Sequence, residues 1–409
     1  MKCTQTRILL FIFLLAPSIP TFACTTIILS GKATKDGRPL MWKNSDTTDP
    51  RHSLFYSDYK GYPFLGIVRN TSVNENTASI WMGTNSEGFS IMNTLSYNLT
   101  EEQESSRNGA VMRKALEICR TVSDFKNMLD TLPRPMKIEA NFGVIDAEGN
   151  AAYFEASSGG YQMLDVNDPA VAPEGYLIYT NFSYKGFFDK GEGYIRYLSA
   201  GHEVAKCLPS KDFSPQWIFN HLSRSFYHSL MDVDFGSKQV LEIFRGYLHD
   251  SDFIPRRSTA SSTVIHGVRK GENPDLTTMW VALGYPPCSV AVPAWVKAGK
   301  DNPSIVMRRD DETHSSKMCD MVLALKETLF DVKRGHGQEY FNFYKVCNSE
   351  GSGYMQKLAP VENQIFRMTN PLLAKWREAG KPDTNEIQAL GKAITGLIEN
   401  SWPGQETNP

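Results

Sequence analysis

Short runs of apolar and β-branched residues, separated by turns that contain glycine, fill the first half of the chain after residue 23. A tight hairpin turn requires a residue with positive φ, which glycine adopts without steric cost. We therefore predict positive φ at Gly37, Gly88 and Gly149. The pattern predicts strands at residues 24–34, 38–46, 78–85, 89–97, 141–147, 151–156, 175–183, 261–268 and 277–284.

Apolar residues at three- and four-residue spacing mark the predicted helices. These helices are expected at residues 109–132 with a break near Ser123, and at 214–224, 314–334, 369–380 and 383–402. Ser214 followed by Pro215 is a favourable helix start. Antiparallel strands with helices segregated from them predict an α+β layered fold, with a mostly helical region beyond about residue 310.

The first 23 residues have the three parts of a signal peptide. Lys2 and Arg7 form the basic flank, an apolar core follows, and small residues end the segment at Ala23. The core is too short to remain as a membrane anchor. We therefore expect export to the periplasm or the extracellular space, no membrane insertion after cleavage, and Cys24 as the first mature residue.

Composition excludes several classes of function. The formal net charge is −2 at pH 7, so the chain carries no basic footprint for nucleic acid. Its seven cysteines lie at wide, irregular spacings without a zinc pattern. We expect no metal and no cofactor, and we interpret most of the cysteines as buried apolar residues.

An N-terminal cysteine carries both a nucleophile and a base. The thiolate is a strong nucleophile, and the α-amine of the same residue has an ordinary pKa of about 7.7–8.0, which suits proton transfer near neutral pH. Asp46 ends the hairpin that Cys24 begins, so it is a candidate to orient the amine. Asn85 and Asn181 end predicted strands, and their side-chain amides are candidate oxyanion donors.

Five segments resemble the N-terminal-nucleophile amidases in sequence and order. They are "CTTIILSGKATKDGRPLMWKNSD", "GTNSEGFSIMNT", "NFGVIDAEGNAAYFE", "IYTNFS" and "SSTVIHGV…MWVALGYPPCS". Within this class the chain looks like the isopenicillin-N acyltransferase-like linear amide C–N hydrolases, and choloylglycine hydrolases are more distant. The resemblance covers residues 24–290, and the helical tail has no counterpart in it.

The resemblance implies a four-layer αββα sandwich with a helical C-terminal extension. The implied domains are a signal peptide at 1–23, an amidase domain at 24–310 and the extension at 311–409, packed on the core. Cys24 matches the nucleophile and Asp46 the acidic residue near its amine. Asn85 matches an oxyanion-hole contact, and Asn181 a residue that lines the site.

Two positions depart from the choloylglycine hydrolase pattern. Lys43 stands where those enzymes have arginine, which keeps the charge but loses the planar fork. Thr263 stands where they carry another arginine, which argues against bile-salt substrates. Arg256 and Arg257 lie nearby in sequence but do not match the motif. We expect Lys43 and Thr263 to contact substrate.

The predicted function is an exported cysteine amidohydrolase that cleaves a small-molecule acyl amide through a thioester, with acyl transfer as a related activity. Signal peptidase is the expected source of the free amine, with self-cleavage before Cys24 as the alternative. Two other functions compete. One is a surface lipoprotein that binds a small ligand, although Thr21 and Phe22 fit a lipobox poorly; the other is a dipeptidase with the same nucleophile.

Overall fold

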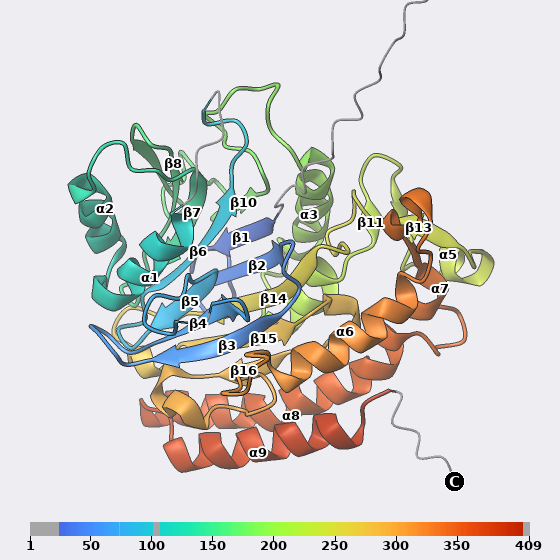
Figure 1. Ribbon diagram of the computed structural model, residues 1–409. Coiled ribbons are helices and arrows are strands. Elements are labelled where there is room, and N and C mark those ends of the chain that lie inside the picture. The colour runs from blue at the N-terminus through green and yellow to red at the C-terminus, as the bar shows by residue number, and fades with distance from the viewer. Residues whose placement is uncertain (1–23, 73, 101–106, 404–409) are drawn as a thin grey trace, which may run out of the picture.

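The computed structural model of the protein describes residues 24–72, 74–100 and 107–403. The predicted signal peptide, residues 1–23, lies outside the described residues. Two antiparallel sheets are stacked at the centre of the molecule (Figure 1). The six-stranded sheet contains, in spatial order, β10 (Tyr176–Tyr179), β1 (Thr25–Leu29), β2 (Leu40–Asp46), β14 (Thr259–His266), β15 (Thr278–Leu283) and β16 (Val292–Ala294).

The second sheet has seven strands in sequence order. They are β3 (His52–Ser57), β4 (Phe64–Arg69), β5 (Met82–Asn85), β6 (Ser90–Leu95), β7 (Ala140–Ile145), β8 (Ala151–Ala156) and β9 (Tyr161–Asp165). The two sheets contact each other through β2 and β7, β1 and β8, and β15 and β3. The first and second strands of the chain therefore lie at the interface between the sheets.

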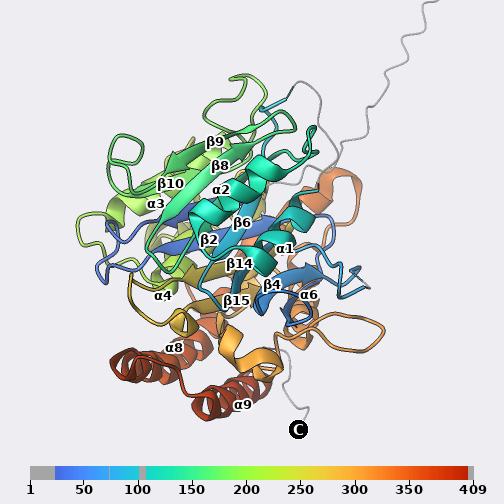
Figure 2. The ribbon, with the colours of Figure 1, turned by 90° about the vertical axis from the view of Figure 1, so that its left-hand side faces the viewer.

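Helices cover the outer face of each sheet (Figure 2). The longer helices are α1 (Asn108–Ile118), α2 (Val122–Thr131), α3 (Tyr194–Cys207), α6 (Lys317–Leu329), α8 (Tyr354–Ala379) and α9 (Thr384–Asn400), and the short helix α4 is Pro215–Ile218. Helix α1 contacts β5 and β6, whereas α3, α4 and α6 contact β10, β14 and β15. This order of layers confirms the predicted αββα sandwich.

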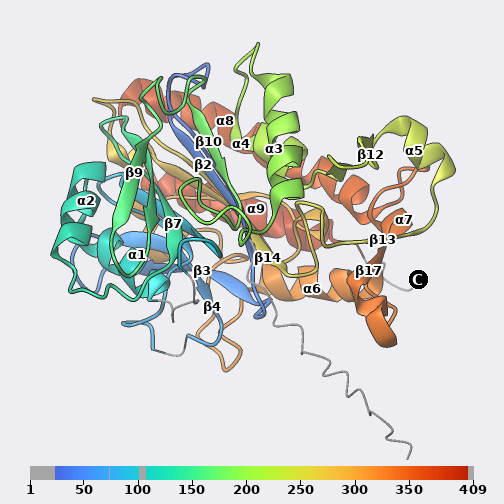
Figure 3. The same cartoon turned by 90° about the horizontal axis from the view of Figure 1, so that it is seen from above.

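A smaller group of elements lies at one end of the molecule, away from α1 and α2 (Figure 3). It consists of α5 (Lys238–Ile243), α7 (Phe343–Val346) and two short ribbons, β11 (Tyr227–His228) with β12 (Val233–Asp234), and β13 (Tyr247–His249) with β17 (Tyr340–Asn342). The second ribbon joins chain segments that are far apart in sequence.

All the strands predicted from the sequence are present, and their turns have the expected geometry. Gly37, Gly88 and Gly149 have φ values of 73°, 76° and 85°. The sequence pattern did not predict β3, β4, β9 and β16, nor the short strands β11, β12, β13 and β17. Gly66 in the middle of β4 explains part of this, because a glycine inside a strand weakens the pattern. It is required there, since a Cβ would lie 2.9 Å from Ile80 Cγ2.

The helix prediction differs from the structure in several places, including the short helices α5 and α7, which were not predicted. Helix α8 begins at Tyr354, although the expected helix began at residue 369, and its interior contains Pro360 and Pro371. Proline normally interrupts a helix, which hid the continuous pattern. Helix α3 was not predicted at all. The predicted helix at 214–224 is a short α-helix, capped by Ser214, that continues as a π-helical turn over Phe219–Ser223.

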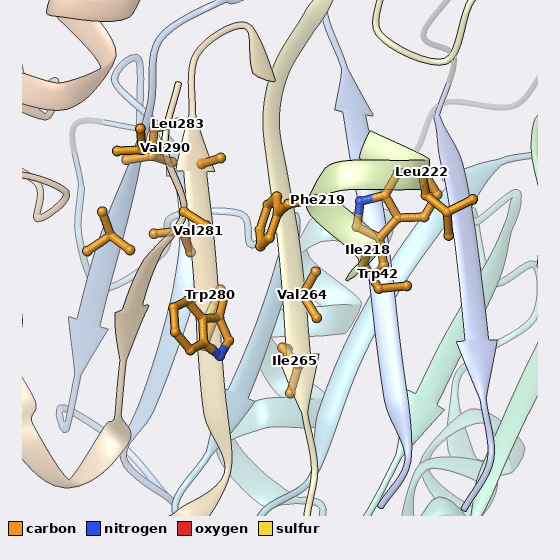
Figure 4. Packing of buried hydrophobic residues seen from close by; sticks show 14 of the residues in the cluster. Trp42, Ile218, Phe219, Leu222, Val264, Ile265, Trp280, Val281, Leu283 and Val290 are labelled. Carbon is orange, nitrogen blue, oxygen red and sulfur yellow. The ribbon is translucent and has the colours of Figure 1, made fainter. Parts of the chain in front are cut away.

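The core of the six-stranded sheet is packed against the helices that cover it. Figure 4 shows Trp42, Val264 and Trp280 on three neighbouring strands. The Trp280 ring stacks on Phe366 of α8, with ring centroids 4.3 Å apart. The six cysteines from residue 24 onward are buried, as the sequence predicted for most of them, and they are unpaired. Among the described residues, none of the helices is long and apolar enough to span a membrane.

Candidate active site

Cys24 lies immediately before β1, at the interface between the two sheets, and is 6% exposed. Side chains alternate along a strand, so the Cys24 side chain shares a face with Thr26 and Ile28. That face points to the seven-stranded sheet, because the Tyr153 hydroxyl donates to Thr26 Oγ1 at 3.1 Å and Ile28 packs against Gly143. The candidate nucleophile therefore lies between the sheets, where β1 begins.

Asn181 and Arg196 hold the backbone of Cys24. The Cys24 nitrogen donates to Asn181 Oδ1 at 3.1 Å. Arg196 Nη1 donates to the Cys24 carbonyl oxygen at 2.8 Å and to Thr25 Oγ1 at 2.9 Å, and Arg196 Nη2 donates to Asn181 Oδ1 at 2.9 Å. Asn181 Nδ2 donates to the Leu95 carbonyl oxygen at 3.0 Å. Both polar backbone groups of Cys24 are thus held by side chains from distant segments.

The start of helix α3 places Arg196. The helix begins after Gly193, which has a φ of 83°. A Cβ on this residue would lie 2.4 Å from Arg196 Nη2 and 2.9 Å from Thr180 Cβ. Glycine therefore supplies both the left-handed backbone and the space that the guanidinium occupies.

Asp46 ends β2 and is almost fully buried. Its Oδ2 accepts from Arg256 Nε at 3.0 Å and Nη2 at 2.8 Å, and its Oδ1 accepts from Thr259 Oγ1 at 2.6 Å. An irregularity in β14 between Thr259 and Ser261 brings Thr259 opposite Asp46. Two donors of one arginine and a threonine hydroxyl therefore hold the carboxylate, and the charge-assisted hydrogen bonds from the arginine are stronger than neutral ones.

Lys43 crosses the interface between the sheets. Its Nζ donates to the Trp81 carbonyl oxygen and to Asn93 Oδ1, both at 3.0 Å. Thr263 lies directly opposite Lys43 in the β2–β14 ladder, so both side chains are on the same face. The Arg69 guanidinium stacks over the Trp81 ring, 4.0 Å from its centroid.

Asn85 has different neighbours from the other predicted site residues. Its Nδ2 donates to the carbonyl oxygens of Leu116 and Cys119, and its Oδ1 accepts from two backbone nitrogens of its own turn. Asn85 ends β5, whereas Trp81, whose carbonyl Lys43 contacts, precedes the same strand. The described contacts of Asn85 belong to the β5–β6 turn and to the end of α1, and the structure does not bring it to Cys24.

The charges near Cys24 are mostly positive. Burial acts to lower the pKa of four basic side chains near Cys24, namely Lys43, Arg69, Arg196 and Arg256, and the neighbouring Cys24 side chain acts in the opposite direction. The net pKa is therefore lowered for Lys43 and Arg69 and falls to about 10 for Arg196, whereas that of Arg256 is raised. Buried positive charge of this kind favours a developing oxyanion.

Three residues of this site were not identified from the sequence as site residues. Arg196 lies 172 positions from Cys24, in a helix that the pattern did not predict. Asn93 follows Asn85 in the same hairpin. Only the hydrogen bond that it accepts from Lys43 distinguishes it from Asn85 as a site residue. Arg256 lies near the motif in sequence, and its ion pair with Asp46 places it in the site. A buried carboxylate such as that of Asp46 requires a basic partner, and this requirement could have identified Arg256.

The described residues contain no group of three or more His, Cys, Asp and Glu side chains that could hold a metal ion. What they bring together is a thiol, the backbone nitrogen of the same residue, an acid–base pair and a buried ammonium. These groups suit attack on a polarised carbonyl carbon.

Comparison with known proteins adds a family match and distant structural similarities. Residues 33–196 match the model of the acyl-coenzyme A:6-aminopenicillanic acid acyl-transferase family. No curated protein matches the chain. A variant of the conjugated bile acid hydrolase from Clostridium perfringens is 13% identical, with 64% of this chain and 89% of that chain covered and a TM-score of 0.39.

Two further solved structures are similar to the same degree. For an N-acylethanolamine-hydrolyzing acid amidase ortholog from Caenorhabditis elegans, the identity is 14%, 59% of this chain and 92% of that chain are covered, and the TM-score is 0.39. For penicillin V acylase from Agrobacterium tumefaciens, the corresponding values are 13%, 67%, 86% and 0.39.

The family match includes Lys43, Asp46, Asn181 and Arg196 and ends before Arg256. It is shorter than the resemblance expected from the sequence, which extended over residues 24–290. Over residues 33–196, the chain is thus similar to the acyl-coenzyme A:6-aminopenicillanic acid acyl-transferase family, which confirms the resemblance that its motifs indicated.

Proposed function

We propose that the protein is a cysteine amidohydrolase of the N-terminal-nucleophile type, which cleaves a linear amide bond through a thioester. The observation that carries this proposal is the clamp on Cys24. Asn181 accepts from its nitrogen, and Arg196 donates to its carbonyl oxygen. A residue that needs its own backbone nitrogen as a base requires that nitrogen to be held in a fixed position.

Cleavage after Ala23 would turn the Cys24 nitrogen into a free amine. In the first step, the amine takes the thiol proton while the sulfur attacks the amide carbonyl carbon. The resulting ammonium then gives this proton to the leaving nitrogen as the C–N bond breaks. In the second step, the amine activates water, which attacks the thioester carbon and releases the acid and the free thiol.

Lys43 is the group that we assign to the oxyanion of both steps. Its ammonium is buried, lies on the face of the sheet that Cys24 shares, and is within electrostatic range of the sulfur. Its pKa is lowered by burial, so a negative charge that develops nearby is strongly favourable for it. Asp46, held by Arg256, balances the positive charge of the site and supports the amine. We propose that Thr263, which lies opposite Lys43 in the ladder, contacts the substrate.

Acyl transfer belongs to the same proposal. The matching family is described by an acyl transfer to 6-aminopenicillanic acid, in which an amine attacks an acyl group. A thioester on Cys24 can be attacked by water or by an amine, and the two reactions differ only in the acceptor.

Substitution of Cys24 tests the proposal. We expect Cys24→Ala and Cys24→Ser to lower kcat for hydrolysis of N-acyl amides by at least about 10³-fold, because the nucleophile is lost or weakened. Cys207→Ala is the matched control, since Cys207 is also a buried, unpaired cysteine but lies at the end of α3. Retention of activity in either Cys24 variant would exclude the proposed mechanism. A parallel panel of dipeptides separates the amidase from a dipeptidase.

The state of the N-terminus separates the amidase from a surface lipoprotein. The intact mass of the mature protein is expected to correspond to a chain that begins at Cys24 without modification. A diacylglyceryl addition would instead support the lipoprotein. We also propose that the protein is exported and that cleavage after Ala23 accompanies export. Fractionation of the producing cells should then place the mature form outside the cytoplasm.

A further inference from the structure

A cavity of about 460 Å³ lies beside the Asp46–Arg256 pair. Thr47, which directly follows Asp46 in the chain, lines the cavity. Arg256, whose guanidinium binds the Asp46 carboxylate, also lines it. Helix α6 contributes Lys326 to its wall. This cavity therefore borders the candidate active site and also touches a helix that lies beyond the residues of the family match.

The cavity is close enough to Cys24 to receive part of a bound amide. The β1–β2 ladder pairs Thr25 with Asn44, so Cys24 lies opposite Ser45 if the ladder continues by one residue. Thr47 is two residues farther along the same segment, a distance of about 7 Å at the ordinary rise of a strand. The pKa of Arg256 is raised by Asp46, then by Asp250 and to a smaller extent by Cys24, against the effect of burial.

Lys326 places a buried ammonium in the wall of this cavity. Its side chain is only 6% exposed, and its Nζ donates to the Arg257 carbonyl oxygen. Burial, followed by the charge of Arg257, lowers the pKa of Lys326 to about 8, although Asp250 acts in the opposite direction. An ammonium has three donors, so an anion in the cavity would improve the compensation of a charge that burial destabilises.

Three carboxylates also line the wall, and each has a partner of its own. Asp250 Oδ2 accepts from the Arg257 backbone nitrogen. Glu327 pairs with Lys333 at 2.8 Å, and Glu339 lies 3.3 Å from His249. The lining therefore combines these engaged acids with three basic residues, Arg256, Arg257 and Lys326. Arg256 is paired with Asp46, so Lys326 is the buried cation of the lining that an incoming anion can approach.

We propose that this cavity binds a carboxylate carried by the amide substrate, and that Lys326 is the residue that recognises it. The inference rests on the proposed amidase function and names its substrate class, which is N-acyl amino acids and small acyl peptides. Since the family match ends at residue 196, this recognition would be supplied by a part of the chain beyond it.

Binding to an inactive variant tests the inference without turnover. In the Cys24→Ala background, calorimetry compares N-phenylacetylglycine with N-phenylacetylglycinamide, which differ only in carboxylate against neutral amide. The same comparison is made with the decanoyl pair. We expect the carboxylate probe of at least one pair to bind at least tenfold more tightly, and Lys326→Met to reduce that preference to less than twofold.

Two further variants make the result specific. Lys317→Met is the matched control, because Lys317 starts the same helix but is half exposed and pairs with Glu399. It should leave the preference unchanged. Lys326→Gln keeps a donor for the Arg257 carbonyl oxygen and replaces Lys326→Met if thermal unfolding shows that the latter is not folded.

Three outcomes would overturn the inference: no binding of any probe, equal binding within both pairs, or a preference that survives both Lys326 substitutions. None of these outcomes affects the amidase proposal, which depends on the loss of turnover in the Cys24 variants. Conversely, if the wild-type protein shows no turnover but binds the carboxylate probe preferentially through Lys326, the carboxylate site is supported and the amidase proposal fails.

Discussion

Arg196 connects three groups that otherwise come from separate parts of the chain. Its guanidinium contacts the Cys24 carbonyl oxygen, Thr25 Oγ1 and Asn181 Oδ1. It also lies within electrostatic range of Asp46. In the proposed reaction it does not touch the substrate, so it is a positioning residue for the nucleophile and its nitrogen.

Replacement of Arg196 should therefore misplace the nucleophile without removing it. We expect Arg196→Met to lower kcat by about 10- to 100-fold, since a displacement of about 1 Å can cost that much. Iodoacetamide should still alkylate Cys24, which shows that the thiol is present and accessible. Arg120→Met is the control, because Arg120 is exposed and pairs only with Glu87 among the described ion pairs. An unchanged kcat in Arg196→Met would contradict the positioning role.

A substitution of Asn85 can show whether this residue belongs to the site or has a structural role. Its amide satisfies two carbonyl oxygens at the end of α1, and its oxygen accepts from its own turn. We expect Asn85→Ala to lower the free energy of unfolding by about 1–3 kcal/mol, because buried polar groups lose their partners. If Asn85 has only this structural role, kcat should remain within threefold.

An oxyanion donor would behave differently. Its removal lowers kcat by about 10²–10³-fold. Urea unfolding and steady-state kinetics on Asn85→Ala therefore separate the two roles. A large loss of kcat in a variant that is fully folded at the assay temperature would restore the oxyanion-hole assignment that the sequence motif implied for Asn85.

At the scale of elements, α8 binds the C-terminal part of the chain to the six-stranded sheet. The contact between Phe366 and Trp280 is a stacked, fully buried aromatic pair. We expect Phe366→Ala to lower the free energy of unfolding by about 3–5 kcal/mol, as large-to-small substitutions of buried aromatic residues do. Lys357→Ala, on the exposed side of the same helix, should change it by less than about 0.5 kcal/mol. Equal effects would mean that α8 does not share the core.

The elements that the sequence predicted are those with a strong local signal. The three hairpins with glycine turns are present, because turn chemistry and alternation act within a few residues. Helix α8 was predicted only in part, because Pro360 and Pro371 oppose the local preference and the burial of Phe366 and Trp376 outweighs it. Local propensity is only a weak guide where tertiary packing decides.

The site was predictable to the extent that it follows β1 and β2. Cys24, Lys43 and Asp46 lie on adjacent strands, so their relation could be inferred from one hairpin. Arg196 and Asn93 could not be inferred, because their positions depend on how α3 and the second sheet pack onto that hairpin. The contacts Lys43–Asn93 and Cys24–Arg196 join residues 50 and 172 positions apart, and such distant contacts leave no local pattern in a single sequence.

At the scale of the whole molecule, one hydrophobic cluster extends from Ile27 to Trp402. A second cluster lies between the seven-stranded sheet and the helices α1 and α2. We propose that residues 311–409 form an extension that packs on the amidase domain at 24–310, as the sequence suggested. A shared cluster of this kind indicates that the two parts unfold together, rather than as independent units.

The stability of the whole molecule should depend on pH through His52. This residue is fully buried between the sheets, and its Nδ1 lies 2.9 Å from Ser261 Oγ. Burial, followed by the charges of Arg69 and Lys43, lowers the pKa of His52 from 6.5 to about 3. The unfolded chain therefore takes up a proton near pH 6.5, which the folded protein takes up only near pH 3.

It follows that the free energy of unfolding decreases as the pH falls from about 6.5 toward 3. His52 accounts for up to about 1.4 kcal/mol per pH unit of this decrease. We expect the pH dependence measured by urea unfolding between pH 6 and 4 to be weaker in His52→Gln by roughly this slope. His336→Gln, in which an exposed histidine is replaced, should show the wild-type slope. Identical slopes in all three proteins would refute the assignment.

The proposed mechanism requires one covalent bond, between the Cys24 sulfur and the acyl group of the substrate. Acid quenching during turnover, followed by mass spectrometry of the N-terminal peptide, measures it directly. We predict a peptide that begins at Cys24, with a free amine, and carries the acyl mass as a thioester that hydroxylamine removes. A peptide with a different or blocked N-terminus, or an unmodified Cys24 when the acyl mass is found on another residue, would contradict the account.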